Sequence, residues 1–478
     1  MTTDPTPADP TPTPTPTGST PTGSTPTETS PDPKDVRTAV SSGVIGTAVE
    51  YYDFFVYGTA AALVLNELFF PTFSPALGTL AAFATFAVGF VVRPIGAIVL
   101  GHIGDRVGRK KALVFSLVLM GVATFAIGLL PTYSSAGVLA PILLVTLRLV
   151  QGLALGGEWG GATVLASEYA GRGNRGFLAS FVQLGSPLGL LMSSGAFALV
   201  GLGSDEFVQS WGWRIPFLAS AILVAIGLYI RVRIMESPEF RRATAAGEMS
   251  TRTPLVEVFT YSWRQVLIAI GIRFVPDIGF YMAATFLVSY ATTTMGYPRG
   301  AILSCVMIAA AIELITIPLF GRLSDRIGRK KVYLFGVVFL TLLAFPLFAL
   351  VSSGSILLTG IGVVLALAVG HAATWGLSAA INSELFPTRY RTTGAGLGLN
   401  VSNIVGGGPA PLIASSLVIA AGGGSWLVSL YIVAAGVLSL IAIVSMAETS
   451  GRDLSEDYSS RTAPAPTGIT PEVRGQTL

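Results

Sequence analysis

The stretch GHIGDRVGRKK at residues 101–111 returns as GRLSDRIGRKK at residues 321–331. Glycine, Asp-Arg and Gly-Arg-Lys-Lys occupy the same offsets in both copies, and the first residues, 101 and 321, differ by 220. Alone, such a basic, glycine-spaced segment fits a nucleic-acid patch, a phosphate-binding loop or an exposed turn. The sequence around the two copies has to distinguish these possibilities.

The surrounding sequence is strongly apolar. The chain is 51% hydrophobic and only 12% charged, whereas soluble proteins carry roughly a quarter of charged residues. Apolar segments of about 20 residues recur along the chain, each long enough to cross ~30 Å of hydrocarbon. One cysteine and two histidines exclude a disulfide framework and a His/Cys zinc site, and we expect no metal. The composition therefore predicts a polytopic membrane protein.

The apolar segments predict an all-α fold, because a helix satisfies its own backbone hydrogen bonds in lipid. Twelve spans are expected, near residues 40–65, 77–100, 112–130, 138–161, 176–200, 214–233, 265–290, 300–319, 332–351, 355–383, 393–420 and 426–447. The Pro/Thr-rich residues 1–37 predict a disordered tail without the features of a cleaved signal peptide. Residues 449–478 predict a second polar tail.

The basic residues predict the orientation. Both copies of the repeat, Arg172 and Arg175, the stretch 234–262, and Arg389 and Arg391 fall on one side of the membrane, with Arg299 the only clear basic residue on the other. By the positive-inside rule, that basic side and both termini are cytoplasmic, in the inner (plasma) membrane.

The repeat also divides the chain. Each copy joins the second and third span of a six-span half, and Ser167-Glu168 is echoed at Ser383-Glu384, a shift of 216 (383 minus 167). We therefore expect two parallel six-helix bundles at 38–233 and 263–448, joined by a cytoplasmic linker at 234–262. Major facilitator transporters have this layout.

Further motifs resemble that superfamily. The paired GxxxDRxGRKK loops look like its signature loop, and RLVQGLALGGEWGGA (148–162) resembles its fourth-helix motif. IGTAVEYYDFFVYG, WGWRIPFL and MESPEF resemble the metabolite:proton symporter family, most like its shikimate-transporter branch, with proline/betaine transporters more distant. The resemblance implies the major facilitator fold and a transporter driven by the proton gradient, without another cofactor.

With this topology, neither repeated loop suits nucleic acid or a nucleotide. Each is only eleven residues between spans, and neither has the GxxxxGK[ST] pattern of a phosphate-binding loop. A pure topology signal remains the alternative. A topology signal needs only basic residues, so the repeated aspartate suggests a further role. We expect Asp105 to accept hydrogen bonds from the amino-terminal N–H groups of the eleventh span, which begins near Thr392. The resemblance implies a cytoplasmic latch of the outward-facing state, formed by Gly101, Asp105, Arg106, Gly108, Arg109, Glu168, Asp325, Arg326, Arg329 and Glu384, with Arg109–Glu168 and Arg329–Glu384 as expected ion pairs.

Four ionisable residues are expected near the middle of the membrane, from a rise of ~1.5 Å per residue: Glu50, Asp53, Arg93 and Arg148. An unpaired charge there costs about 2.5–3.5 kcal/mol, so a shared wet cavity is expected, with a structural ion pair as the alternative. We assign proton coupling to Asp53, Glu50 and Arg148, with Arg148 pairing with ionised Asp53. Arg93 is the expected carboxylate ligand, with Tyr52 and Gln151 beside it.

The carboxyl-terminal half supplies Arg273 and Asp277 as further substrate-binding candidates. Their spacing of four residues also fits a pair that only satisfies itself. Glu158, Glu313 and His371 are weaker candidates, with structural roles as the alternative.

These features predict a proton-coupled symporter that imports a small polar metabolite by alternating access, a carboxylate such as shikimate or a keto-acid. A proline/betaine-type osmolyte symporter and a proton-coupled drug or metabolite antiporter are the alternatives. A membrane receptor or sensor would need a cytoplasmic module that is not evident, and an enzyme would need a nucleophile–base pair or metal cluster. The expected partners are the substrate, protons and membrane lipid, not nucleic acid, and we expect a monomer.

Overall fold

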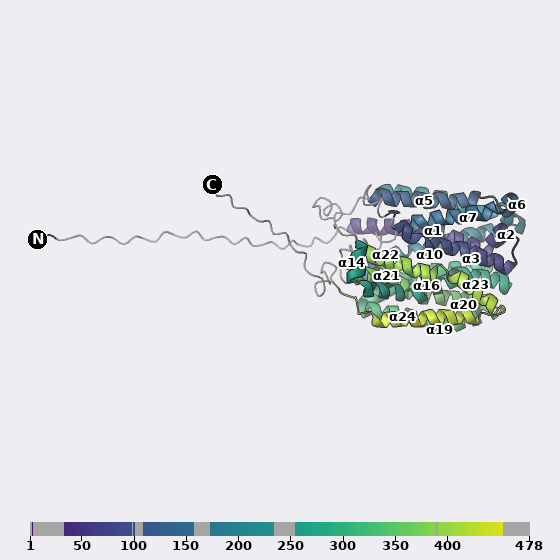
Figure 1. Cartoon of the computed structure of the whole chain (residues 1–478). Helices are drawn as coiled ribbons and strands as arrows, with labels where there is room; N and C mark the ends of the chain where they lie inside the picture. Colours follow the sequence, from purple (N-terminus) through teal and green to yellow (C-terminus); the bar gives the residue numbers. More distant parts are fainter. Residues whose placement is uncertain are drawn as a thin grey trace.

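The computed structural model describes residue 2 and residues 33–97, 99–100, 109–156, 173–233, 254–387 and 391–452. In these segments the chain is helical and contains no strand. The helices lie side by side along one axis, with the amino-terminal half on one side of the molecule and the carboxyl-terminal half on the other (Figure 1). Gly101, Asp105, Arg106, Gly108, Glu158 and Glu168 lie outside the described residues.

The helices of the amino-terminal bundle follow the expected order of spans, and short helices cover one end. Their bounds are α1 Pro33–Leu63, α2 Leu65–Phe69, α3 Pro75–Val91, α5 Arg109–Leu129, α6 Tyr133–Ala136, α7 Leu139–Gly156, α9 Arg175–Gln183, α10 Gly185–Val200, α11 Asp205–Phe207, η1 Val208–Gly212 and α12 Arg214–Arg233.

The carboxyl-terminal bundle contains several π-helical turns, a feature frequent at functional sites, whereas η1 is the π-helical turn of the described part of the amino-terminal bundle. The α-helices are α14 Pro254–Tyr261, α15 Trp263–Gly271, α16 Phe274–Tyr281, α17 Leu287–Ser289, α18 Arg299–Ile327, α19 Arg329–Val351, α20 Ile356–Val364, α21 Ala372–Leu385, α22 Arg391–Ser402, α23 Ala410–Ala420 and α24 Trp426–Ser445. The π-helical turns are η2 Met282–Phe286, η3 Tyr290–Thr294, η4 Leu365–His371 and η6 Asn403–Gly407.

Membrane-length helices account for the expected spans. Nine helices of the described part are long and apolar enough to cross a membrane, and a bent pair, Asp205–Gly212 with Arg214–Tyr229, makes ten. The remaining two of the twelve expected spans are α1 and α5. Charged residues lower their hydropathy: α1 carries Glu50 and Asp53, and α5 begins with three basic residues. Twelve spans in two bundles therefore form the fold, as the sequence predicts.

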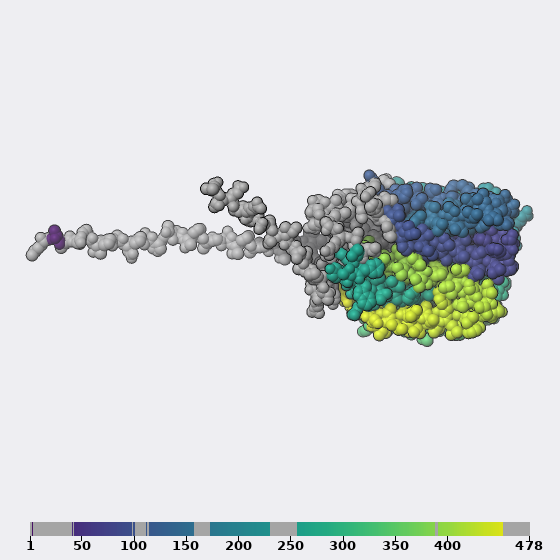
Figure 2. Space-filling view, viewed as in Figure 1, coloured from purple at the N-terminus to yellow at the C-terminus, as the bar shows by residue number. Residues whose placement is uncertain are grey.

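The apolar side chains divide between the core and the outside of the bundle. Large aromatic and aliphatic residues fill the interior, whereas others such as Leu357 (74% exposed), Leu342 and Leu199 project outward. Outward-facing leucines along a helix are expected where lipid surrounds the protein. In the space-filling view the two halves meet along the length of the molecule (Figure 2).

The two ends of the bundle differ in charge. We call the end that holds α14 and the first residues of α9, α19 and α22 the basic end, and the other end the opposite end (Figure 1). Arg214 lies at the opposite end with Arg299, so Arg299 is not alone there. Its guanidinium is partly buried, donating to the carbonyls of Gly128 and Leu130 at 2.8 and 2.6 Å.

Candidate functional site

A polar cavity lies between the two bundles, midway along their length. The empty volume of the cavity is about 600 Å³, a value that includes solvent space at its open side. Its lining comes from both halves: Glu50, Tyr51, Phe54, Arg93, Leu155 and Ser186 from the first, and Arg273, Asp277, Phe280, Tyr281, His371, Trp375, Leu399, Asn400 and Asn403 from the second. The expected site residues among them are Glu50 and Arg93 of the first half, Arg273 and Asp277 of the second, and the weaker candidate His371.

Arg93 presents its guanidinium to this cavity between two aromatic rings. The guanidinium carbon lies 4.2 Å from the centroid of Phe90 and 5.0 Å from that of Phe54, distances typical of cation–π contacts. Among the described residues Arg93 forms no ion pair, and its Nε has no hydrogen-bond partner. The cavity therefore contains a cation whose charge no neighbouring carboxylate pairs with directly.

Arg273, in contrast, is neutralised by its neighbour on the next turn. Its Nη2 and Nε donate to the two carboxylate oxygens of Asp277 at 2.8 and 3.2 Å. Ser402 of α22 donates to the same carboxylate at 2.9 Å and accepts from Arg273 at 3.1 Å. Arg273 and Asp277 therefore satisfy each other's charge, the alternative that their spacing suggested. The guanidinium carbon of Arg273 also lies 5.2 Å from the ring centroid of Trp375.

Arg148 and Asp53 lie inside the amino-terminal bundle and do not line the cavity, and no ion pair joins them in the described part of the chain. Arg148 donates to Gln151 at 2.9 Å and to the carbonyl of Phe86 at 3.1 Å, and stacks on Tyr57. Neither carboxylate oxygen of Asp53 has a hydrogen-bond partner among the described residues, and only 1% of the residue is exposed. Burying an ionised carboxylate without a partner is expensive, so this arrangement suits the protonated acid.

Two of the expected substrate ligands also lie away from the cavity in this conformation. Gln151 holds Arg148 and donates to Thr124 at 2.7 Å, and the Tyr52 hydroxyl donates to the carbonyl of Pro216 at 2.7 Å. In their place the structure offers Asn400 and Asn403. Two amides three residues apart in an apolar span were a readable signal, since polar residues within membrane helices usually face a cavity.

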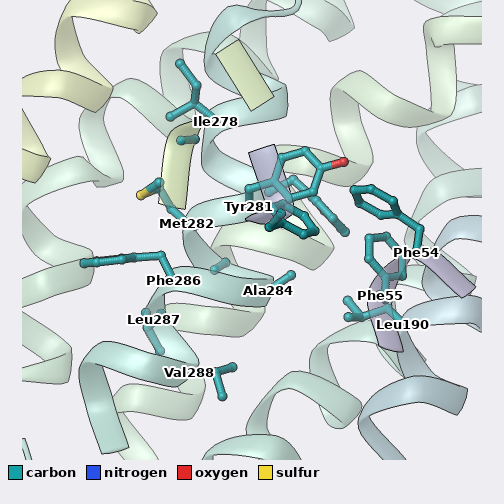
Figure 3. Close-up of a cluster of buried hydrophobic side chains, with 14 of the residues drawn as sticks. Phe54, Phe55, Leu190, Ile278, Tyr281, Met282, Ala284, Phe286, Leu287 and Val288 are labelled. Carbon is teal, nitrogen blue, oxygen red and sulfur yellow. The ribbon is translucent and has the colours of Figure 1, made fainter. Parts of the chain in front are cut away.

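Side chains of both bundles meet on the two sides of the cavity. Toward the opposite end, Phe54, Phe86 and Phe90 of the first bundle surround Tyr281 of the second at centroid distances of 6.1, 5.8 and 5.7 Å. Figure 3 shows Tyr281 beside Phe54 in this apolar cluster. Toward the basic end, Gln183 Nε2 donates to the carbonyl of Trp375, and Trp375 Nε1 donates to the carbonyl of Gln183, both at 3.2 Å.

The basic end is closed by a buried network that we call the basic gate: Arg175, Gly176, Asp325, Arg329 and Glu384. The Asp325 carboxylate accepts from the backbone N–H groups of Gly176 and of Phe177, each at 2.9 Å. These N–H groups begin α9, where the helix dipole favours an anion. A Cβ on Gly176 would lie 2.6 Å from the carbonyl of Gly321, so this close approach requires glycine.

Ion pairs complete the basic gate. Arg329 contacts Asp325 at 2.6 Å and Glu384 at 3.4 Å, and Arg175 of the other bundle contacts Glu384 at 3.2 Å. Of these contacts, the sequence predicted the Arg329–Glu384 ion pair. Arg326 makes no ion pair among the described residues, and the side chain of Arg109 lies outside them.

The segment after α24 is part of the same network, although the sequence suggested only a polar tail. Glu448 accepts from the N–H groups of Arg329 at 2.9 Å and Lys330 at 3.2 Å. Thr449 donates to Glu384 at 2.7 Å, and the carbonyl of Arg452 accepts from Arg175 at 3.1 Å. Partial burial raises the pKa of Glu448, but four backbone N–H donors outweigh it and lower the pKa from its ordinary value of 4.5.

Known proteins share this chain's sequence and architecture. The chain is 40% identical over 415 residues to the shikimate transporter of Escherichia coli K12, covering 86% of this chain and 95% of the relative. It is 35% identical over 436 residues to the proline/betaine transporter of the same organism, covering 88% and 86%. A D-xylose-proton symporter structure superposes with a TM-score of 0.67 at 20% identity, covering 87% of this chain and 99% of that one, which shows the fold.

These relatives are membrane transporters rather than enzymes. The family model of the Major Facilitator Superfamily matches residues 43–411, which include all the residues that line the cavity and the helices of both bundles up to the start of α23. The chain therefore belongs to the Major Facilitator Superfamily of membrane transporters.

Proposed function

We propose that this transporter takes up a small carboxylate together with protons, with shikimate as the first candidate. The observation that carries the proposal is Arg93, a buried guanidinium at the cavity that forms no ion pair with any residue the structure describes. A guanidinium offers two parallel donors to a carboxylate. Asn400 and Asn403 add amide groups for hydroxyls of the substrate.

The charge of the cavity supports an anionic ligand better than a cationic one. Arg273 and Asp277 cancel each other, and Arg93 and Glu50 are the other arginine and the other carboxylate of the lining. If Glu50 is protonated during the cycle, the cavity gains a net positive charge and an anion is favoured. The relative that is 40% identical and is named a shikimate transporter is consistent with that class.

Proton coupling is assigned to Asp53, with Glu50 beside it on the same helix. Among the described residues the Asp53 carboxylate has no hydrogen-bond partner, and Arg148 is held by Gln151 and Phe86. We propose that loss of the Asp53 proton attracts Arg148 away from these acceptors and changes the balance between conformations. Each proton supplies about 2.3 kcal/mol per 100 mV of membrane potential.

The remaining parts of the proposal concern placement. We propose that the protein is a monomer in the inner membrane, in contact with lipid, and that its basic end faces the cytoplasm with both termini. The domains at 38–233 and 263–448 are then the two rocking units, and Asp105 acts in the amino-terminal copy of the gate as Asp325 does in the other.

A transport assay with purified protein tests the function. In proteoliposomes with an alkaline interior, labelled shikimate is expected to accumulate above equilibrium, and a protonophore is expected to abolish the accumulation. Empty liposomes are the control. Accumulation of proline or betaine but not shikimate would favour an osmolyte symporter. The relative that is 35% identical is named a proline/betaine transporter. Expulsion of substrate by the same gradient would show antiport.

A further inference from the structure

The helix α14, at the basic end, has its charged residue on the inside and apolar residues on the outside. Glu257 is only 6% exposed, and Val258 beside it is fully buried. Val256 and Phe259, in contrast, are 58% and 54% exposed. Water favours the reverse arrangement, because exposing apolar side chains and burying a carboxylate both cost free energy. The outer face of α14 therefore suits contact with a less polar medium than water.

The packing of α14 directs this face away from the bundle. α14 lies against α15 and α22, and α22 is an inner helix that lines the cavity through Leu399 and Asn400. Ser262, with φ −133° and ψ 23°, separates α14 from α15, so α14 is a helix of its own rather than part of the following span. In Figure 2 the start of the carboxyl-terminal half, in teal, forms part of the side of the molecule at the basic end.

The exposed apolar residues continue from α14 onto the membrane span that follows it. Phe259, Trp263 and Leu267 succeed one another at intervals of four residues, and all three are exposed. Trp263 begins the membrane-length helix Trp263–Thr294, so Leu267 lies one turn inside a span. An exposed leucine on a span of a membrane transporter faces lipid. Because the same row of side chains begins on α14, the outer face of α14 meets the membrane where hydrocarbon and headgroups adjoin.

A basic residue lies at the level of these headgroups. Arg264 is exposed beside Trp263, and its guanidinium carbon lies 5.4 Å from the centroid of the Trp263 ring. None of the ion pairs among the described residues involves Arg264. Tryptophan is enriched where hydrocarbon meets headgroups, and a guanidinium binds phosphate through parallel donors. The two neighbouring side chains together complement a phospholipid whose headgroup is negatively charged.

We propose that the outer face of α14 (Val256, Phe259 and Trp263) lies in the headgroup region of the membrane, and that Arg264 binds the phosphate of an anionic phospholipid such as phosphatidylglycerol. Helices with one apolar face bind membrane surfaces in this way. A zwitterionic lipid carries a cation next to the same phosphate, so Arg264 attracts it less. None of these four residues lines the cavity, so the proposal does not depend on the identity of the substrate.

Spin labels on the full chain in nanodiscs test where the outer face lies. Cys305 is the only cysteine, so Cys305→Ser provides a background for a single label at Val256→Cys, Phe259→Cys or Thr392→Cys. Thr392 is the aqueous control, since it is exposed in the first turn of the inner helix α22. The labels on α14 are expected to collide more with oxygen than with a water-soluble nickel complex, and the label at Thr392 the reverse. Labels on α14 that are as open to nickel as the control, or shielded from both reagents by protein, would overturn the placement.

Fluorescence quenching of Trp263 tests the choice of headgroup. The chain has six tryptophans, so the difference between the wild type and Trp263→Phe gives the signal of Trp263. Phosphatidylglycerol or phosphatidylcholine, each brominated near its headgroup, is mixed into the bilayer in increasing amounts. One basic residue at the surface enriches an anionic lipid about fivefold. Half-quenching is therefore expected at an about fivefold lower fraction of brominated phosphatidylglycerol than of brominated phosphatidylcholine.

Variants of Arg264 identify the group that makes this choice. Arg264→Gln is expected to make the two lipids quench alike, whereas Arg264→Lys keeps most of the preference, and high salt reduces it in the wild type. Arg299→Gln, at the opposite end, is the control and should keep the full preference. Equal quenching by both lipids in the wild type, or an undiminished preference in Arg264→Gln, would overturn the phosphate site. A Trp263 signal that neither lipid quenches would overturn the membrane contact as a whole.

Discussion

Trp375 and Gln183 hold each other across the boundary between the bundles, each donating a side-chain N–H to the other's backbone carbonyl at 3.2 Å. The pair lies between the cavity and the basic gate, so it must separate before the cavity opens to that end. Both acceptors are backbone carbonyls. A side-chain substitution at either residue therefore removes the bond that this residue donates and keeps its carbonyl as the acceptor of the second bond.

Trp375→Phe and Gln183→Met are each expected to remove one of these bonds. A hydrogen bond contributes about 1 kcal/mol net, so each change raises the open fraction at the basic end about fivefold. Hydrogen exchange of the peptide that contains α9 measures this opening. A larger effect in the double variant than in either single one is expected, and unchanged exchange in all three would exclude a role for the pair in closure.

Asp325→Asn is expected to impair transport about tenfold or more and to leave substrate affinity within about twofold. The amide replaces one of the oxygens that accept from Gly176 and Phe177, and a hydrogen bond to a charged group contributes about 1.5–3 kcal/mol. Uptake rate and equilibrium binding are measured together. Asp205→Asn, at an exposed site of the opposite end, is the control.

The same change at Asp105 is expected to act alike, because the repeat places Asp105 and Asp325 at the same offset. Normal transport with weakened binding in either variant would contradict a gating role.

Arg93→Lys is expected to weaken binding of shikimate about tenfold or more, although the positive charge is retained. Lysine lacks the two parallel donors of the guanidinium and its planar contact with Phe54 and Phe90. Calorimetry on purified protein measures the loss, with Arg264→Lys at an exposed site of the basic end as the control. Undiminished binding by Arg93→Lys would move the anion site elsewhere, with Arg273 as the next candidate.

Asp53→Asn is expected to exchange shikimate across the membrane but no longer to concentrate it, because asparagine imitates the protonated acid. Counterflow and pH-driven uptake in proteoliposomes measure the two activities separately. Glu50→Gln is the comparison, since Glu50 lies one turn away and lines the cavity. Uphill accumulation by Asp53→Asn would exclude Asp53 as the coupling residue.

Glu448 predicts a pH dependence of the basic gate. Its folded-state pKa is lowered, so its contribution to stability is complete above the ordinary value of 4.5 and is lost as the pH falls through the folded-state pKa. The melting temperature of Glu448→Gln is therefore expected to be lower than that of the wild type at pH 7, and the difference should disappear in acid. Glu206→Gln, exposed at the opposite end, should show no such difference at either pH.

The fold was predictable because its determinants repeat along the chain. Hydropathy defined the spans, the basic loops defined the two ends, and the duplicated motif defined the halves. The motif predicted that Asp105 contacts the start of a facing helix, and Asp325, at the same offset of the second copy, makes a contact of this kind with the N–H groups that begin α9. The residues that face one another inside the bundle were less predictable. The position of a residue along its span gives its depth in the membrane, but the rotation of each helix about its own axis depends on packing against the other helices.

Gln151 and Asp53 illustrate the limit. Both lie at the depth of the cavity but do not line it. Gln151 accepts a hydrogen bond from Arg148, and Asp53 is buried inside the amino-terminal bundle. Thr449 illustrates another, since polar residues after a final apolar helix look like solvent-exposed chain. Its burial depends on Glu384, which lies 65 residues earlier, and such a distant pairing leaves no local pattern.

The short segment Glu448–Arg452 also determines where the protein tolerates alteration. Its hydrogen bonds to Arg175, Arg329 and Glu384 join the end of the last helix to both bundles. A truncation or an affinity tag placed after Arg452 leaves these bonds in place, whereas a truncation after Ser445 removes them, including the hydrogen bond that Thr449 donates to Glu384. The usable carboxyl terminus for engineering therefore begins seven residues beyond the membrane helix that Ser445 ends (452 minus 445).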